Sequence, residues 1–153
     1  MKHLEECERD LVKVAIDLRD DVYGVETLWA APLGDGRYQL RNVPFLAYGF
    51  SEDDVVNAAD NGDRLIVADV AERSGHSTYR IFLRQPTDEA AFAPLWKPLA
   101  DLGCTYERAN TRLIAIDVPP NADVYAVYEV LEQGEQAKTW EFEEGHCGHR
   151  LRE

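Results

Sequence analysis

A histidine and an arginine lie four residues apart in the sequence Ser-Gly-His-Ser-Thr-Tyr-Arg, which runs from Ser74 to Arg80. The imidazole of His76 is suited to act as a general base, and the guanidinium of Arg80 is suited to bind an anion. Such chemistry also requires an orienting carboxylate, and the acidic residues that suit this role are Asp53, Asp54 and Glu72. In the alternative interpretation, Gly75 forms a tight turn, the hydroxyl groups bind turn amides and His76 packs against the protein.

The segment Arg41–Phe45, with the sequence Arg-Asn-Val-Pro-Phe, is a second candidate. If it lies near the histidine segment, Arg41 and Asn42 complete a ligand pocket there. In the alternative interpretation the segment is a strand crossing, in which Asn42 binds the backbone and Phe45 fills the core. The sequence alone leaves both interpretations open.

Residues of metal-ligand type occur close together near the end of the sequence, at His146, Cys147 and His149. A structural zinc site requires four well-placed ligands. These residues reach that number only if Cys7 or His3 from the other end of the sequence joins them. Without such a partner the pattern is typical of chance composition in a frayed terminus, so no metal or other cofactor is expected.

Acidic residues outnumber basic ones by 29 to 16, which leaves a formal net charge of −13. Such a surface repels phosphate, so direct nucleic-acid binding is not expected, whereas a cationic partner would be attracted. Two groups of carboxylates are candidates for contacting that partner: Glu52, Asp53 and Asp54 in the first half, and Glu129, Glu132 and Glu135 in the second. In the alternative interpretation they are solvated faces whose charge maintains solubility.

The cysteines and the short apolar runs indicate the compartment. The three cysteines, at positions 7, 104 and 147, fit a reducing compartment better than a disulfide framework. The longest apolar runs are too short for a membrane span. The first residues are polar and acidic, and no apolar stretch typical of a secretory signal follows them. We therefore expect a cytoplasmic protein without a membrane partner.

The first half of the sequence predicts a small β-structure. Apolar and polar side chains alternate from Val12 to Arg19, the period-two pattern of a half-buried strand. The further predicted strands are Glu26–Leu33, Arg37–Leu40, Phe45–Tyr48, Val55–Ala59 and Arg64–Arg73. Glycine-containing turns separate several of them. Short strands joined by such turns predict a small barrel or a bent antiparallel sheet over residues 1–76.

From Thr78 onward the order of elements is β-α-β-β-α-β. The predicted strands are Thr78–Arg84, Cys104–Arg108, Arg112–Val118 and Trp140–Glu144, and the helices are capped by Thr87 and Asn121. Pro94 and Pro98 are expected to kink or split the first helix. This order is that of the ferredoxin-like split βαβ unit. We therefore predict an α+β protein in which a ferredoxin-like half, residues 77–153, packs against the barrel-like half.

Several stretches of the sequence together carry a family resemblance. They are VKVAIDL, ETLWAAPL, GRYQLRNVPFLAYGF, Asp54-Val55-Val56 and ERSGHSTYR, and the sharpest parts are Arg41–Phe45 and Ser74–Thr78. In these stretches the chain resembles an uncharacterised bacterial family, domain of unknown function 4265. The resemblance covers most of the chain and implies no activity. In size and acidity the chain is also similar to small bacterial immunity proteins that neutralise toxins.

An excess of carboxylates without an assembled reactive centre predicts a non-enzymatic binding protein. The expected partner is a cationic protein, and the similarity to immunity proteins points to a toxin domain whose active site is masked. The alternative is a small enzyme or ligand-binding domain that uses His76, Arg80, Arg41 and Asn42. A structure with these four side chains on separate faces would exclude the alternative.

Overall fold

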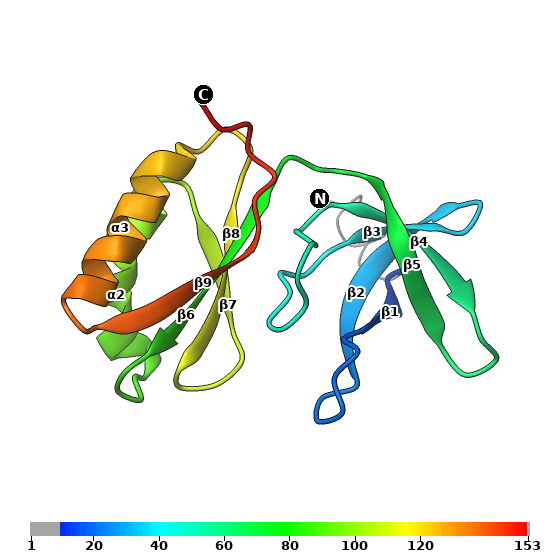
Figure 1. The fold of residues 1–153 in the computed structure, drawn as a ribbon, viewed down its shortest axis with the longest axis horizontal. Coiled ribbons are helices and arrows are strands. Elements are labelled where there is room, and N and C mark those ends of the chain that lie inside the picture. The colour runs from blue at the N-terminus through cyan, green and yellow to red at the C-terminus, as the bar shows by residue number, and fades with distance from the viewer. Residues whose placement is uncertain (1–9, 153) are drawn as a thin grey trace.

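Residues 10–152, which the computed structural model describes, form two β-structures joined by a short connector (Figure 1). Strands β1–β5 form a closed barrel, and strands β6–β9 form a four-stranded sheet that carries two helices. The last barrel strand ends at Glu72 and the next strand begins at Ser77, so the connector comprises residues 73–76. The predicted α+β architecture with an N-terminal barrel is confirmed.

The barrel consists of β1 (Val12–Asp17), β2 (Val25–Gly34), β3 (Arg37–Leu40), β4 (Val55–Asp60) and β5 (Leu65–Glu72). Consecutive strands pair in antiparallel fashion. Strands β1 and β5 close the barrel as parallel neighbours, with Val14 opposite Leu65. The period-two pattern of the first strand places Val14 and Ile16 in the barrel core with Leu28, Leu40 and Val56.

The second half consists of β6 (Ser77–Leu83), α2 (Glu89–Asp101), β7 (Thr105–Arg108), β8 (Leu113–Val118), α3 (Val124–Gln136) and β9 (Trp140–His146). The strand order in the sheet is β7-β8-β6-β9, and all neighbours are antiparallel. Tyr79, Ile81 and Leu83 of β6 pack in the core beneath the helices, which cover one face of the sheet (Figure 1). Thr78 and Arg80 point to the other face, where both bind the barrel half.

Helix α2 continues through Pro94 and Pro98, although the sequence predicted that they would kink or split it. Both prolines are exposed, whereas Phe92, Trp96 and Leu99 on the opposite side are buried. The prolines remove intrahelical donors on the solvent side only. Water can bind the carbonyl groups that lose their partners, so the helix is not divided.

Helices α2 and α3 span 13 residues each. The sequence predicted Thr87 and Asn121 as their N-terminal caps, but the caps in the structure are aspartates. The side chains of Asp88 and Asp123 accept hydrogen bonds from amides of the first helical turn. A carboxylate binds these amides and also interacts favourably with the positive end of the helix dipole. Among residues 10–152, neither helix has the length and apolar composition needed to cross a membrane.

A linking loop, residues 41–54, takes the place of the strand predicted at Phe45–Tyr48. The carboxylate of Glu26 accepts hydrogen bonds from the backbone amides of residues 45, 46 and 47, at 2.6, 3.0 and 2.8 Å. Because one side chain binds these amides, they cannot pair with a neighbouring strand. The segment therefore forms a tightly held loop.

The linking loop packs the two halves against each other. Arg80 of β6 donates hydrogen bonds to the carbonyl oxygens of Pro44 and Ala47, at 3.2 and 2.9 Å. Glu107 of β7 accepts a hydrogen bond from the amide of Val43 at 2.6 Å. Loop residues of the barrel half are thus bonded directly to strands of the second sheet.

Candidate functional site

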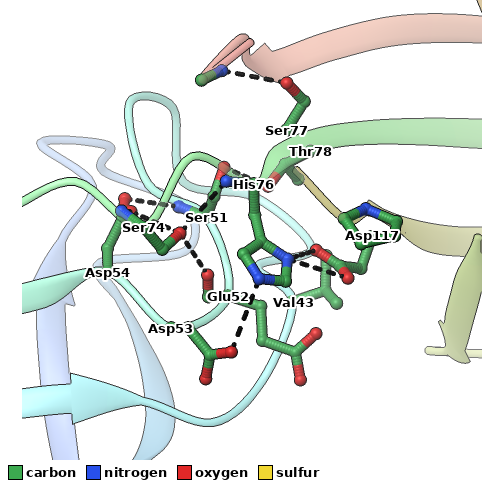
Figure 2. Close-up of polar contacts among 12 residues, drawn as sticks. Val43, Ser51, Glu52, Asp53, Asp54, Ser74, His76, Ser77, Thr78 and Asp117 are labelled. Atoms are coloured by element: carbon green, nitrogen blue, oxygen red, sulfur yellow. Dashed lines mark hydrogen bonds and ion pairs between the residues drawn. The ribbon is translucent and has the colours of Figure 1, made fainter. Parts of the chain in front are cut away.

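His76 lies where the linking loop, the connector and strand β8 meet (Figure 2). Its Nδ1 atom is 2.8 Å from Oδ1 and 3.0 Å from Oδ2 of Asp117, near the end of β8. Its Nε2 atom is 3.5 Å from Oδ2 of Asp53, in the loop. The side chains of His76 and Asp117 are only 15% and 5% exposed. The imidazole is therefore held between two carboxylates, one from each half of the protein.

Asp54 positions the two chain segments that carry this site. Its buried carboxylate accepts hydrogen bonds from the amides of Ser51 and Ser74, at 3.0 and 2.8 Å. Arg73 forms an ion pair with the same carboxylate at 3.2 Å. Because Ser51 belongs to the loop and Ser74 to the connector, Asp54 holds the loop at a defined distance from His76.

Glu52 and Asp117 form a pair of carboxyl groups beside the imidazole. Burial raises the pKa of Glu52 to about 8, and the charges of Asp117 and Asp53 add to this effect. Burial also raises the pKa of Asp117, although the hydrogen bond with His76 acts in the opposite direction. One proton is therefore retained between Glu52 and Asp117 at neutral pH.

Arg41 reaches the same cluster from the loop, with its guanidinium 3.6 Å from Asp53. The predicted proximity of Arg41 and His76 thus arises through a shared carboxylate. In the part of the chain that the structure describes, no lysine or arginine forms an ion pair with Glu52 or Asp117. The cluster therefore holds more carboxylates than cations.

The pairing of Asp117 with His76 is a geometry that orients an imidazole for proton transfer. A carboxylate at Nδ1 leaves Nε2 as the reacting atom, but here Nε2 faces Asp53. The hydroxyl of Ser74 in the connector donates instead to the carbonyl oxygen of Glu52, at 2.7 Å. Within residues 10–152, no hydroxyl or thiol group is hydrogen-bonded to Nε2, so the cluster lacks an activated nucleophile.

The two other residues of the predicted pocket, Arg80 and Asn42, have structural roles. The side chain of Asn42 accepts a hydrogen bond from the amide of Trp29 at 2.8 Å and donates one to Glu107 at 3.0 Å. Arg80 is buried and binds the linking loop. The contacts of Asn42 agree with the alternative in which it binds the backbone, and of the four predicted residues only His76 and Arg41 share a partner.

The predicted acidic binding residues do not form one surface. The prediction is wrong for Asp54, because its side chain is buried and cannot touch a partner. Glu52 and Asp53 lie at the junction of the two halves. The other group consists of Glu129, Glu132 and Glu135, which are exposed on α3. This helix covers the face of the second sheet that is turned away from the barrel (Figure 1).

The sequence predicted a frayed terminus, but the C-terminal segment 146–149 packs against the second sheet. The Nδ1 atom of His149 is 2.6 Å from the hydroxyl of Ser77, and its Nε2 atom is 2.9 Å from the carbonyl oxygen of Pro119. Both ring nitrogens are used, which leaves none for a metal ion beside His146 and Cys147. The residues considered as further ligands, Cys7 and His3, lie outside the described residues.

A pocket of about 370 Å³, which was not predicted from the sequence, lies between the barrel and strand β9. Two exposed rings, those of Tyr23 and Tyr48, line it. Its charged lining residues are Asp17, Asp20, Glu143 and Arg19, and of the carboxylates Glu143 is also paired with the buried Arg80. A signal was present in the turn Asp20-Asp21-Val22-Tyr23, in which an aromatic residue follows two acidic residues at a distance of two positions.

Comparison with known proteins assigns the chain to a family. The model of a domain of unknown function, DUF4265, matches residues 26–142. The chain belongs to the DUF4265 family. No curated protein matches it. A solved structure described as the "novel crystal structure of a hypothetical protein from Neisseria gonorrhoeae" is similar, with a TM-score of 0.78, 16% sequence identity and coverage of 90% of this chain and 96% of that chain.

The DUF4265 match confirms the resemblance inferred from the sequence. At 16% identity the Neisseria gonorrhoeae structure shows similarity of fold alone. The matched range 26–142 includes Glu52, His76 and Asp117, whereas Tyr23 of the pocket lies before it. The histidine cluster is thus within the DUF4265 domain, and the pocket extends beyond it.

In this DUF4265 protein, Glu52→Gln is expected to raise the melting temperature at alkaline pH in buffer that contains a metal chelator. The pKa of Glu52 is about 8 in the folded protein and near 4.5 without these neighbours. The unfolded state therefore loses this proton first, so the wild type loses stability as the pH rises from about 5 to about 8. The side chain of glutamine does not ionise in this pH range, so the variant lacks this loss of stability.

The measurement is thermal unfolding followed by circular dichroism at pH 5 and pH 9. We expect the fall in melting temperature between these pH values to be smaller in Glu52→Gln than in the wild type by more than about 2 °C. Glu129→Gln on α3 is the matched control, because Glu129 is exposed. Equal pH dependence in the two variants would contradict the raised pKa of Glu52.

Proposed function

We propose that this DUF4265 protein is a non-enzymatic binding protein that holds a cationic protein partner. The observation that carries the proposal is the pocket between the barrel and β9, where tyrosine rings and carboxylates occur together. A lysine or arginine side chain is attracted both by carboxylates and by the faces of aromatic rings. We infer that the partner inserts such a side chain between Tyr23 and Tyr48.

The charge of the whole chain supports the same function at longer range. A net charge of −13 attracts a cationic protein and raises the rate at which the two meet. The narrower form of the proposal is an immunity protein that masks the active site of a cationic toxin domain. The small size and acidity of the chain support this form.

The experiment is a calorimetric titration with the protein products of the adjacent genes. The test variant is the double substitution Asp17→Asn, Asp20→Asn, because asparagine keeps the side-chain oxygen that accepts the turn amides. We expect it to weaken the complex by at least about tenfold, since each substitution removes a close carboxylate from the pocket.

The matched control is Glu129→Gln, Glu132→Gln, which removes the same charge from the exposed face of α3. It is expected to change the affinity by less than about threefold, because only long-range attraction is lost. Equal effects of the two double substitutions would place the partner elsewhere. If none of the products of the adjacent genes binds, the proposed function is wrong.

A second candidate function, a small enzyme or ligand-binding domain, is favoured by one observation, the orientation of the His76 imidazole by Asp117. Arg41 remains part of this candidate site because it pairs with Asp53, which also contacts His76. Arg80 instead binds the linking loop, and Asn42 binds the backbone. His76→Ala and Arg41→Ala are expected to abolish a cellular phenotype if this candidate is correct. An unchanged phenotype in both variants would reject it.

We also propose that the second half is a ferredoxin-like split βαβ unit. The element order β-α-β-β-α-β and the strand order β7-β8-β6-β9 support this assignment. Interstrand nuclear Overhauser contacts between β6 and both β8 and β9 are the measurement that tests it. Contacts between β6 and β7 in their place would contradict it.

A cytoplasmic location is part of the same proposal. Cys104 and Cys147 are free thiols, which is typical of a reducing compartment. Cell fractionation of the native host tests the location.

A further inference from the structure

We propose that Glu52, His76 and Asp117 bind one divalent transition-metal ion at the junction of the two halves. One ligand atom from each of these residues lies within 4.8 Å of the others. Figure 2 shows the carboxyl groups of Glu52 and Asp117 beside the imidazole of His76. The inference is independent of the proposed binding of a cationic protein.

The spacing of the three ligand atoms is close to that of a coordination sphere. Bonds from zinc to nitrogen and oxygen ligands are about 2.0–2.2 Å long, so two ligands of one tetrahedral ion are about 3.3–3.6 Å apart. Ligand atoms that are up to 4.8 Å apart reach this spacing when the side chains shift by about 1 Å. His76 Nδ1 and Asp117 Oδ1 are 2.8 Å apart in a hydrogen bond, which the ion would replace when it binds both atoms.

The donor set also favours such an ion. An imidazole nitrogen suits Zn²⁺, Fe²⁺ or Cu²⁺, and carboxylate oxygens bind Zn²⁺ and Mn²⁺ readily. Three protein ligands leave a position for water, as in zinc sites with an open coordination position. A cation would also offset the excess of carboxylates, because Arg41 pairs with Asp53 and not with Glu52 or Asp117.

The surroundings of His76 provide a second, separate argument. When Nδ1 binds the ion, Nε2 carries the remaining ring proton. Nε2 faces the carboxylate of Asp53 at 3.5 Å, and Asp53 is held by Arg41 at 3.6 Å. A carboxylate that accepts the second N–H of a metal-bound histidine orients the ring and raises its basicity. Asp53 is therefore a positioning residue of the site.

The three ligands come from both halves of the protein, so a bound ion would link the halves. Glu52 belongs to the linking loop, His76 to the connector and Asp117 to β8 of the second sheet. An ion bound by all three joins the barrel half to the second sheet. Because it binds the folded protein and not the unfolded chain, it raises the melting temperature of the intact protein.

The test uses the full chain after treatment with a chelator and its removal. Calorimetric titrations with ZnCl₂ and, separately, MnCl₂ are expected to show one saturable site, and the melting temperature is expected to rise with the ion. Glu52→Gln and Asp117→Asn are each expected to weaken binding by at least about tenfold, and Asp53→Asn by about tenfold. Glu52→Gln is the decisive variant, because it is expected to fold at least as stably as the wild type.

Two controls locate the ion. Glu129→Gln removes an exposed carboxylate from α3 and is expected to leave the affinity unchanged. Cys147→Ser tests the C-terminal segment and is also expected to leave it unchanged. The proposal is overturned if neither ion shows saturable binding, if Glu52→Gln binds as tightly as the wild type, or if Cys147→Ser abolishes binding.

Discussion

Replacing Arg80 with alanine is expected to lower the free energy of unfolding by about 3 kcal/mol or more. The guanidinium is 1% exposed, and its Nε atom donates to Glu143 at 2.9 Å. Its Nη1 atom donates to the carbonyl oxygens of Pro44 and Ala47 in the linking loop. The alanine variant leaves these carbonyl groups without their donor and opens a cavity between the two halves.

The packing around Arg80 contributes to the size of this effect. A Cβ atom at Gly145 would lie 3.1 Å from Nη1, and the ring centroid of Tyr48 lies 4.8 Å from Cζ. The guanidinium therefore fills its space closely. Nη2, however, is a buried atom for which no hydrogen-bond partner is found among the described residues. Removing it relieves one desolvation cost, which keeps the expected loss near the lower end of the range for buried pairs.

Urea denaturation of Arg80→Ala and Arg84→Ala measures the difference. Arg84 follows the same strand and pairs with Glu141 at 3.4 Å, but both side chains are largely exposed. Its removal is expected to change the free energy of unfolding by less than about 1 kcal/mol. Equal losses in the two variants would contradict a central role of Arg80 in joining the halves. Arg80→Met restores part of the packing and shows how much of the loss comes from the hydrogen bonds.

Replacing Asp54 with alanine is also expected to lower the free energy of unfolding by about 3 kcal/mol or more. The variant leaves the amides of Ser51 and Ser74 without their acceptor and the guanidinium of Arg73 without its carboxylate. Because these groups fix the loop against the connector, we also expect the environment of His76 to change.

Urea denaturation and the imidazole resonances of His76 measure the two effects of Asp54→Ala. Asp69→Ala is the matched control: this aspartate lies on β5 and accepts a hydrogen bond from Asn57 at 2.7 Å in an exposed position. Its removal is expected to have little effect on stability. Unchanged His76 resonances in Asp54→Ala would show that Asp54 does not position the site.

The contacts of the linking loop explain why its sequence suggested a ligand pocket. Arg41–Phe45 was a candidate pocket segment because it combines an arginine with an amide side chain. In the structure this segment begins the linking loop, and Asn42 binds the amide of Trp29. Only Arg41 stays near His76, through Asp53. Residue types that suit ligand binding also suit the joining of two packed halves.

The strands of the barrel and the order of elements in the second half could be predicted from the sequence, because they depend on local patterns. Alternation of apolar and polar side chains identified β1, and the change to helical spacing after β6 identified α2. The segment Phe45–Tyr48 was wrongly predicted as a strand because its amides bind Glu26, which lies about twenty residues earlier in the chain.

By itself, the sequence determined most of the strands, the two helices, the family and the acidic charge of this protein, since each depends on composition or on neighbouring residues. The tertiary structure decided which side chains meet. Asp117 is 41 residues from His76, and its contact with the imidazole depends on how β8 lies against the connector. The pocket likewise requires Glu143 of β9 and Tyr23 of the turn between β1 and β2 to lie at one site. Such contacts follow from the packing of the two halves, which no local pattern in the chain specifies.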